Sequence, residues 1–349
     1  MKFPLNKWLF LLLFTVILNS TITIATNNQE KFVPIFCYHR VNPTIKSIYD
    51  LTPAMLESQF QYFKINGYHP ITALQYIQFQ NKPELFPDKP IVLTFDDGSK
   101  DHYNYVFPLL LKYNYKATFF VYPKQIAKKS ARLITWDELS KMVQAGMDIE
   151  SHTFSHSFLT RTKLRPDNPK YLQLITHEIK DSKKIIEENL RIKVLLLAYP
   201  YGWYNCVLET CAVQANYLGV FTVNWGVNRL DENPLRIKRR AVSNRFDFKE
   251  MKSYLTSKPL PLQIISPRNG SIISQKPQIK FKVLNKNINR IDIIVGKYKK
   301  TITPSYDGTY FLDPYKELKS GFHLIIVSAY DKYNQLYINS WGFDYHQPN

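Results

Sequence analysis

Between residues 32 and 242, short apolar runs alternate about seven times with amphipathic helical patterns. Near-continuous apolar runs are typical of strands buried on both faces, and their alternation with helices favours a parallel sheet. Capping boxes at Thr72-x-x-Gln75 and Thr135-x-x-Glu138 mark two of the helix starts. The pattern predicts a parallel sheet closed into a barrel, with strands at Phe32–His39, Ile91–Asp96, Ala117–Tyr122, Met147–His152, Lys193–Pro200, Gly219–Asn224 and Arg236–Val242.

The pattern changes after about residue 260. Three prolines and an Asn-Gly pair between residues 259 and 270 indicate a linker and a turn. The short alternating runs that follow predict a second domain over residues 262–349, an antiparallel, immunoglobulin-like β-sandwich, after a barrel domain over residues 30–258. Its aromatic residues are candidates either for a sugar-binding platform or for the sandwich core and its cross-strand pairs: Tyr298, Tyr310, Tyr315, Tyr330, Tyr333 and Trp341.

The N-terminus predicts export. Lys2 and Lys7 precede an apolar run of 11 residues, Trp8–Leu18, and Thr23-Ile-Ala25 provides a small-residue cleavage site. This is the pattern of a secretory signal peptide over residues 1–25. The run is shorter than the ~20 residues that span a bilayer, and an uncleaved membrane anchor is the alternative. We expect the protein to be secreted or to reside in the cell envelope or periplasm.

The charge of the chain bears on its partners. The formal net charge is +18, and the basic residues are spread along the chain. The sequence holds no zinc finger, RNP-type aromatic motif or basic helix, which argues against nucleic acid as a partner. A basic protein fits association with an anionic cell envelope better. The aromatic content of 15% suits a protein that handles sugars.

The three cysteines, Cys37, Cys206 and Cys211, are too few for a disulfide framework. Cys206 and Cys211 are five positions apart in a predicted helix, which points their side chains away from each other. A bridge between them requires the helix to begin later than expected. Because no cysteine or histidine spacing indicates structural zinc, we expect all three to be structural.

Two adjacent carboxylates end the second predicted strand, in Thr94-Phe-Asp-Asp-Gly98. Side chains alternate along a strand, so Asp96 and Asp97 point in different directions. One carboxylate can then bind a metal ion while its neighbour stays free as a base. The alternative interpretation is a turn, because Asp-Asp-Gly is common turn chemistry.

Two histidines end the fourth predicted strand, in Ser151-His-Thr-Phe-Ser-His156. Their four-residue spacing is that of a two-imidazole metal site if the chain turns helical there. A single histidine at such a place is more often a satisfied core residue, but the chain has only 8 histidines, which makes a chance pair at a strand end improbable. One aspartate with two histidines suits zinc or a similar divalent ion.

The two motifs together resemble the polysaccharide deacetylase family (NodB-homology proteins, carbohydrate esterase family 4), and Ala198-Tyr-Pro-Tyr-Gly202 resembles its third motif. The resemblance covers roughly residues 32–245. It implies a distorted (β/α)7 barrel that hydrolyses the N-acetyl group of GlcNAc-type sugars. By position it implies Asp96 as base, Asp97, His152 and His156 as metal ligands, and the Tyr201 backbone N–H in the oxyanion hole.

The chain departs from the common family pattern. Ala198 stands where many members have arginine, and the Asp-x-x-Asp-Trp and Leu-x-His motifs are missing. Instead, His39 ends the first predicted strand in Cys37-Tyr-His-Arg40, which resembles the branch of biofilm-type poly-β-1,6-GlcNAc N-deacetylases. That resemblance implies His39 as the catalytic acid. The alternative for His39 is a capping or core role, with His102 as the next candidate acid.

Three further residues are candidate substrate-binding groups. Trp136 and Trp225 are expected to line the sugar groove or to pack in the core. Arg239, or its neighbour Arg240, is expected to replace the missing arginine. The resulting hypothesis is a metal-dependent N-deacetylase of an envelope polysaccharide or exopolysaccharide. A glycan-binding protein without activity and an O-acetyl esterase of the same fold are the alternatives. A nucleophilic serine is disfavoured because the sequence has no G-x-S-x-G.

Overall fold

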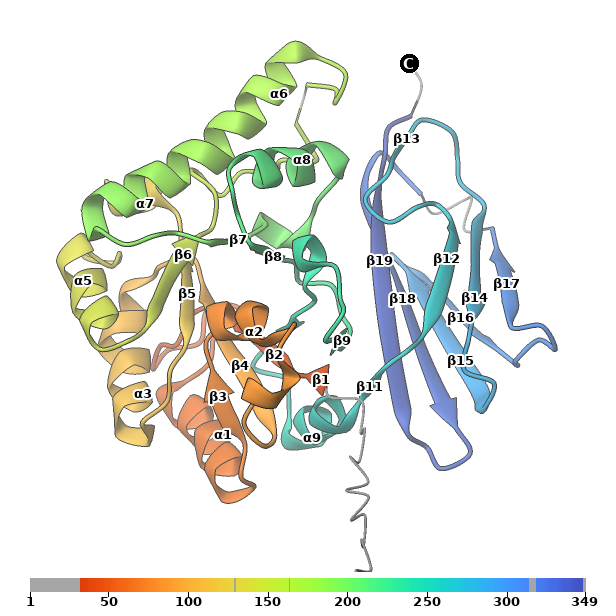
Figure 1. Cartoon of the computed structure of the whole chain (residues 1–349), viewed down its shortest axis with the longest axis horizontal. Helices are drawn as coiled ribbons and strands as arrows, with labels where there is room; N and C mark the ends of the chain where they lie inside the picture. The colour runs from red at the N-terminus through yellow and green to blue at the C-terminus, as the bar shows by residue number, and fades with distance from the viewer. Residues whose placement is uncertain (1–31, 129, 163, 314–317, 348–349) are drawn as a thin grey trace, which may run out of the picture. The chain divides into compact units, whose positions relative to one another are not determined.

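The computed structural model describes residues 32–128, 130–162, 164–313 and 318–347 (Figure 1). The predicted signal peptide or anchor at residues 1–25 lies outside the described residues. From Lys31 to Asn349 the chain forms one compact unit. Among the helices of the described ranges, none combines the length and the apolar character needed to cross a bilayer.

A parallel sheet forms the first part of this unit. Its strands pair in the order β10-β2-β4-β5-β6-β7-β8, with β3 also beside β4. The two ends of the sheet are linked because Phe221 of β8 forms a parallel bridge with Ile237, just before β10. The arrangement fits the predicted (β/α) barrel. The strands are β2 (Ile35–Tyr38), β3 (His69–Ile71), β4 (Pro90–Asp96), β5 (Thr118–Val121), β6 (Asp148–Ser151), β7 (Leu196–Ala198), β8 (Gly219–Phe221) and β10 (Arg240–Ala241).

Helices follow most of these strands and cover the outside of the sheet (Figure 1). Both predicted capping boxes form, at Thr72 and Thr135. The helix predicted from Tyr171 to Leu190 is continuous and includes a π-helical turn in its middle. The helices are α1 (Pro53–Ile65), α2 (Ala73–Phe79), α3 (Phe107–Tyr113), α4 (Pro123–Ile126), α5 (Trp136–Gln144), α6 (Pro169–Thr176), α7 (Ser182–Leu190), α8 (Cys206–Gln214) and α9 (Phe248–Thr256).

Alternation along the strands separates two layers of side chains. On β4, Leu93 and Phe95 join the large apolar cluster that also contains the helix residues. Val92 belongs to a second, interior cluster, and Thr94 and Asp96 share its side of the strand. The polar side chains at the end of β4 therefore reach the mouth of the barrel and not the helical layer.

The seven predicted strands lie where the sequence placed them, although β7, β8 and β10 are shorter than expected. The first predicted strand is divided into β1 (Phe32–Val33), which pairs antiparallel with β9 (Asn228–Arg229), and β2. The short strand β3 was not predicted. Pro70 lies at its centre, and proline is confined to edge strands because it cannot donate to a ladder.

The C-terminal part is all-β, in two sheets. The larger sheet has the order β11-β19-β18-β15-β16 with β13 on β19, and the smaller has the order β12-β14-β17. The strands are β11 (Lys258–Pro259), β12 (Leu262–Ser266), β13 (Ile272–Ile273), β14 (Ile279–Val283), β15 (Ile288–Val295), β16 (Tyr298–Ile302), β17 (Thr309–Leu312), β18 (Gly321–Asp331) and β19 (Leu336–Tyr345). The predicted domain bounds at 258 and 262 stay a prediction, since β11 already pairs with β19.

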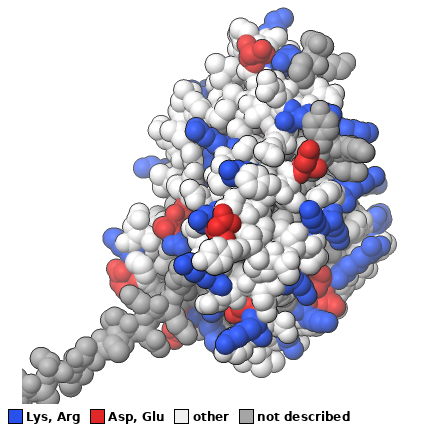
Figure 2. Space-filling model, turned by 90° about the vertical axis from the view of Figure 1, so that its right-hand side faces the viewer, with Lys and Arg blue, Asp and Glu red and all other residues white. Residues whose placement is uncertain are grey.

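The aromatic residues of this part are divided between core and surface. Trp341 and Tyr310 are buried in the apolar cluster of the two sheets, as expected for residues of the sandwich core. Tyr333 is 78% exposed. Tyr315 lies outside the described residues. Basic side chains predominate over acidic ones on the face shown in Figure 2, in keeping with the net charge of +18.

The cysteines form no bridge. Cys37 and Cys211 are buried, Cys206 is exposed, and all three are free thiols. Cys206 is the first residue of α8 and Cys211 lies on its buried side. The helix thus begins where the sequence predicted, and the pairing that required a later start does not form.

Candidate metal and catalytic site

Three donor groups predicted to bind metal converge at the mouth of the barrel. The Asp97 Oδ1 atom lies 3.6 Å from His152 Nε2 and 3.2 Å from His156 Nε2. Asp97 follows β4 directly, and both histidines follow β6. The three ligand atoms all lie within 4.8 Å of one another. Neighbouring ligands of a tetrahedral ion with bonds of ~2.0–2.1 Å are separated by roughly 3.3 Å, so these residues fit a divalent metal.

Two further observations favour a metal at this place. The Asp97 Oδ1 atom is buried without a conventional hydrogen bond, which leaves a carboxylate oxygen available as a ligand. The Nδ1–H group of His152 donates to the Ala198 carbonyl at 2.8 Å. This bond fixes the tautomer that leaves Nε2 free to bind a metal, as is usual for metal-binding histidines. Burial would raise the pKa of Asp97, but the two imidazoles hold it well below its usual value.

The backbone of the site is strained. Asp97, Thr153, His156 and Tyr201 all have positive φ, between 57° and 79°. A positive φ is uncommon for residues other than glycine, and for a β-branched residue such as Thr153 it is a clear outlier. Such conformations cost free energy and persist where the surrounding structure enforces them, often at functional sites. The surrounding structure therefore enforces these backbone conformations in the turns after β4, β6 and β7.

Asp96 is held by Arg239. Its two carboxylate oxygens each accept a hydrogen bond of 2.7 Å from the guanidinium group, and the Arg239 side chain is completely buried. The same guanidinium also donates to Thr94 Oγ1 at 3.0 Å and to the Thr222 carbonyl at 2.9 Å. The Cys37 thiol donates to Asp96 Oδ2 at 3.4 Å. These contacts fix both the position and the orientation of the carboxylate.

The pKa of Asp96 follows from this pair. Burial would raise it, but the charges of Arg239 and His152 outweigh burial and lower it from 3.8 to about 2. Asp96 is therefore ionised at neutral pH, as a general base must be. Because its folded-state pKa is depressed, the pair contributes stability above about pH 4, and this contribution is lost as the pH falls toward 2.

The structure corrects one predicted role. Arg239 was expected to bind substrate, but its buried side chain cannot touch a polysaccharide, and it positions Asp96 instead. Arg240 points elsewhere: its guanidinium lies 4.6 Å from the centre of the Trp225 ring. The sequence alone could not show which of the two arginines contacts Asp96. Closure of the barrel turns Arg239 inward to Asp96, whereas Arg240 does not reach it.

His39 reaches the same mouth from β2. One of its ring nitrogens, the Cys37 thiol and an Asp96 oxygen all lie within 4.8 Å of one another. Its Nδ1 atom is buried without a hydrogen-bond partner, and its ring packs against Tyr49 at 5.2 Å. Burial lowers its pKa, against the opposing effect of Asp96. His102, the other candidate acid, is fully buried and uses Nε2 to hydrogen-bond the His39 backbone carbonyl at 2.7 Å.

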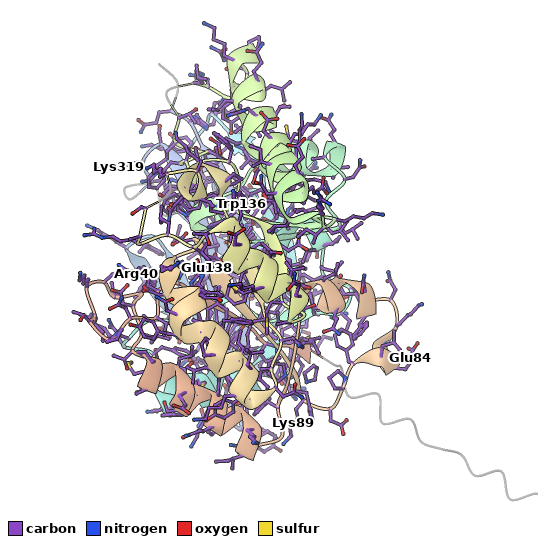
Figure 3. All side chains as sticks on the ribbon, turned by 90° about the vertical axis from the view of Figure 1, so that its left-hand side faces the viewer. Arg40, Glu84, Lys89, Trp136, Glu138 and Lys319 are labelled. Carbon is purple, nitrogen blue, oxygen red and sulfur yellow. The ribbon has the colours of Figure 1, made fainter. Side chains whose placement is uncertain are left out.

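The two predicted tryptophans lie apart from these groups. Trp136 is half-buried at the start of α5 (Figure 3) and borders a hollow of about 520 Å³ with Ile126 and Ala127. Trp225 borders another, of about 320 Å³, with Glu250 and Tyr254. The residues that line the two hollows include neither the carboxylates nor the histidines of the site. A substrate role for either tryptophan stays a prediction.

Replacement of Arg239 by methionine is expected to leave Asp96 as an unpaired buried carboxylate. Breaking a buried pair from one side typically costs about 3–5 kcal/mol, and the rate should fall because Asp96 then favours its protonated form. Denaturant unfolding and acetate release measure the two effects. Arg240→Met is the matched control and should cost less than about 1 kcal/mol. If the two variants are equally stable and equally active, the pairing with Asp96 is unimportant.

Comparison with known proteins identifies the class. Residues 84–220 match the family model "Polysaccharide deacetylase". The putative polysaccharide deacetylase YxkH of Bacillus subtilis is 27% identical over 234 residues, 67% of this chain and 79% of that protein. The chain is thus similar to polysaccharide deacetylases, and these matches support hydrolase activity on the N-acetyl groups of a polysaccharide.

Within the family, the chain is similar to the biofilm branch. The poly-β-1,6-N-acetyl-D-glucosamine N-deacetylase of Staphylococcus epidermidis is 27% identical over 232 residues, 65% of this chain and 80% of that one. The structure of the Streptococcus pyogenes deacetylase PplD in complex with acetate matches with TM-score 0.59 and 26% identity, over 65% of this chain and 99% of that chain. IcaB from Ammonifex degensii shares the fold, with TM-score 0.58 and 24% identity over 64% of this chain and 97% of that chain.

Proposed function

We propose that the protein is a metal-dependent N-deacetylase that removes acetyl groups from a GlcNAc-containing extracellular or cell-envelope polysaccharide. The observation that carries this proposal is the convergence, at one barrel mouth, of a metal-binding triad with the ionised Asp96. The names of the relatives from staphylococci support poly-β-1,6-GlcNAc as the polymer. The basic charge of +18 supports association with an anionic envelope.

The chemistry assigns one role to each group. Asp97, His152 and His156 would hold a divalent ion, which would polarise the acetyl carbonyl as a Lewis acid and lower the pKa of a nearby water. Asp96 accepts the proton of the attacking water. The Tyr201 backbone N–H donates to the oxyanion that forms on the acetyl carbon. Zinc suits the one-carboxylate, two-imidazole ligand set.

The departing amine needs a proton, and His39 is the proposed donor. Its place directly after β2 puts it beside Asp96, whereas His102 already donates to a backbone carbonyl. His39→Ala is expected to retain fold and metal but to lose roughly 10²–10⁴ in kcat on an N-acetyl substrate, the range of general acid–base catalysis. A substrate with a better leaving group should recover part of the rate.

The control for this prediction is His177→Ala, which removes an exposed histidine paired with Asp181 and should be as active as the unchanged protein. Circular dichroism and metal analysis confirm that His39→Ala is folded and loaded. If the His39→Ala protein is folded, contains metal and is fully active, then a group other than His39 is the catalytic acid.

Two alternatives are open to experiment. In an O-acetyl esterase of this fold the leaving group is an alcohol, so acetate would be released from O-acetylated sugars and not from N-acetylated polymer. Parallel assays on N-acetylated and O-acetylated substrates, including poly-β-1,6-GlcNAc, chitin-like oligomers and peptidoglycan, separate the two activities and identify the polymer.

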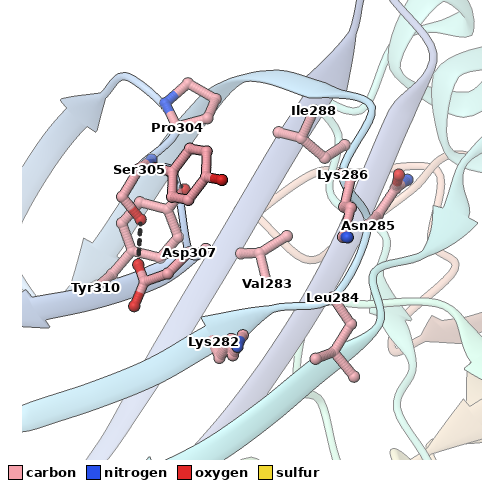
Figure 4. Close-up of a pocket in the computed structure, with 12 residues that line it drawn as sticks. Lys282, Val283, Leu284, Asn285, Lys286, Ile288, Pro304, Ser305, Asp307 and Tyr310 are labelled. Atoms are coloured by element: carbon pink, nitrogen blue, oxygen red, sulfur yellow. Dashed lines mark hydrogen bonds between the residues drawn. The ribbon is translucent and has the colours of Figure 1, made fainter.

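The second alternative is a glycan-binding protein, and one feature of the C-terminal part favours a binding role there. We propose that this part is an immunoglobulin-like sandwich. A hollow of about 550 Å³ at its surface is lined by lysines, tyrosines and polar loop residues (Figure 4). Tyr306 beside it is fully exposed, as suits stacking on a sugar. Binding there is compatible with catalysis in the barrel, and absence of acetate release would leave binding as the function.

A further inference from the structure

A series of aromatic rings leads outward from the metal-binding residues. The His156 ring lies 4.8 Å from the ring of Tyr201, measured between centroids. Phe158 stacks face to face on Tyr201, with centroids 3.8 Å apart and planes 4° from parallel. Trp203 follows at 5.4 Å from Phe158 and 5.5 Å from Tyr201. Three large aromatic side chains thus gather next to a metal ligand, from the loops after β6 and β7.

Trp203 packs partly against the apolar core, but core packing does not account for Phe158 and Tyr201. Phe158 is 44% exposed and Tyr201 is 40% exposed, so each keeps a large apolar area in water although they stack on each other. Exposed aromatic area that is contiguous and lies beside a catalytic centre marks a binding surface. The strained φ of 62° at Tyr201 also fixes where its ring is placed.

The group is supported from the C-terminal sheet. Phe322 of β18 is buried and lies 6.2 Å from Trp203, nearly parallel to it. The exposed Arg161 lies with its guanidinium 4.3 Å from the centre of the Trp203 ring. A Cβ atom added at Gly321 of β18 would be 3.1 Å from Arg161 Nε, which shows how closely this strand and Arg161 approach.

The loop that carries Tyr201 and Trp203 is also hydrogen-bonded to the C-terminal part. The Tyr204 hydroxyl donates to Asn269 Oδ1 at 2.5 Å and accepts from the Gly342 N–H at 3.1 Å. Asn205 Nδ2 donates to the buried Asp344 at 3.0 Å. The loop is therefore held in place by hydrogen bonds to the C-terminal part.

We propose that Phe158, Tyr201 and Trp203 form an aromatic platform that binds the sugar residues next to the one being deacetylated, with the C-terminal sheet as its support. This inference rests on the proposed function. A β-linked GlcNAc polymer fits because each ring has an apolar C–H face for stacking and a rim of hydroxyl and amide groups that Arg161 can hydrogen-bond. The platform begins at His156, so a polymer whose acetyl group reaches the metal ligands continues across it.

The test is binding, so that it does not depend on turnover. Titration calorimetry with a β-1,6-linked GlcNAc pentamer compares the unchanged full chain with Phe158→Ala, Phe158→Tyr and the control Phe311→Ala. Phe311 is 53% exposed on β17 and is not among the platform residues. Loss of one stacking ring should weaken pentamer binding roughly 2- to 13-fold. Phe158→Tyr should restore it, and Phe311→Ala should bind like the unchanged protein.

A second experiment distinguishes sugar binding by Phe158 from a role in positioning the Tyr201 backbone. It measures acetate release from the pentamer and from 4-nitrophenyl acetate in the same protein samples. The platform predicts a larger loss on the pentamer than on the short ester, and through KM more than through kcat. Equal losses on both substrates would mean that Phe158 only holds the Tyr201 backbone in place, which overturns the proposal. Unweakened binding of the pentamer by Phe158→Ala, or no binding by the unchanged protein, also overturns it. Weakened binding without acetate release by any variant would refute the proposed activity and leave the platform standing.

Discussion

Replacement of Asp96 by asparagine is expected to lower kcat by roughly 10²–10⁴, the range of a general base, while the metal is retained. The amide keeps the shape of the side chain but cannot accept the proton of the attacking water. The proposed metal ligands are other groups: Asp97, His152 and His156. Acetate release and metal content measured on one preparation check both parts of the expectation.

The control is Asp101→Asn, which removes a carboxylate that accepts hydrogen bonds from Arg40 and Asn42 and should retain most of the activity. If Asp96→Asn instead empties the metal site, the two adjacent aspartates have exchanged roles. If Asp96→Asn is as active as the control, the base is another group.

The second large effect is expected from His152→Ala. This change removes a fully buried imidazole, one of the three proposed ligands, whose Nδ1–H group is already oriented by the Ala198 carbonyl. With two ligands left, the site should lose its divalent ion, and the rate should fall to the detection limit. Elemental analysis of the purified protein measures the ion directly, and the control His177→Ala should keep about one ion per chain. A His152→Ala protein that keeps a full equivalent of metal would show that the ion, if bound, lies elsewhere.

The order of elements and the strand ends could be predicted because they depend on local patterns. The apolar runs predicted each main strand of the barrel, and alternation along β4 predicted that Asp96 and Asp97 would diverge. In the structure, Asp96 points inward to Arg239 and Asp97 faces the two histidines. The positive φ of 79° at Asp97 that completes this divergence has no pattern of its own in the sequence.

What the sequence did not predict depends on contacts between distant segments. Arg239 is 143 positions from Asp96, and only barrel closure at Ile237 brings it inside. Cys37 was expected to be structural, yet it donates to Asp96. The available signal was its position two residues before His39 on one strand, which places both on the same face. Phe158 and Trp203 lie just after two separate motifs, Ser151–His156 and Ala198–Gly202, and neither motif shows that the two rings meet.

The most direct test of the central claim is the rate of acetate release from N-acetylated β-1,6-GlcNAc oligomer before and after removal of metal. We expect acetate release by the metal-loaded protein, loss of that activity when a chelator strips the ion, and recovery when one equivalent of zinc is restored. The Asp96→Asn protein should take up the same equivalent of zinc without recovering the rate. Full activity in the metal-free protein, or no acetate from the oligomer by the zinc-loaded protein, would contradict the proposal that this barrel is a metal-dependent N-deacetylase.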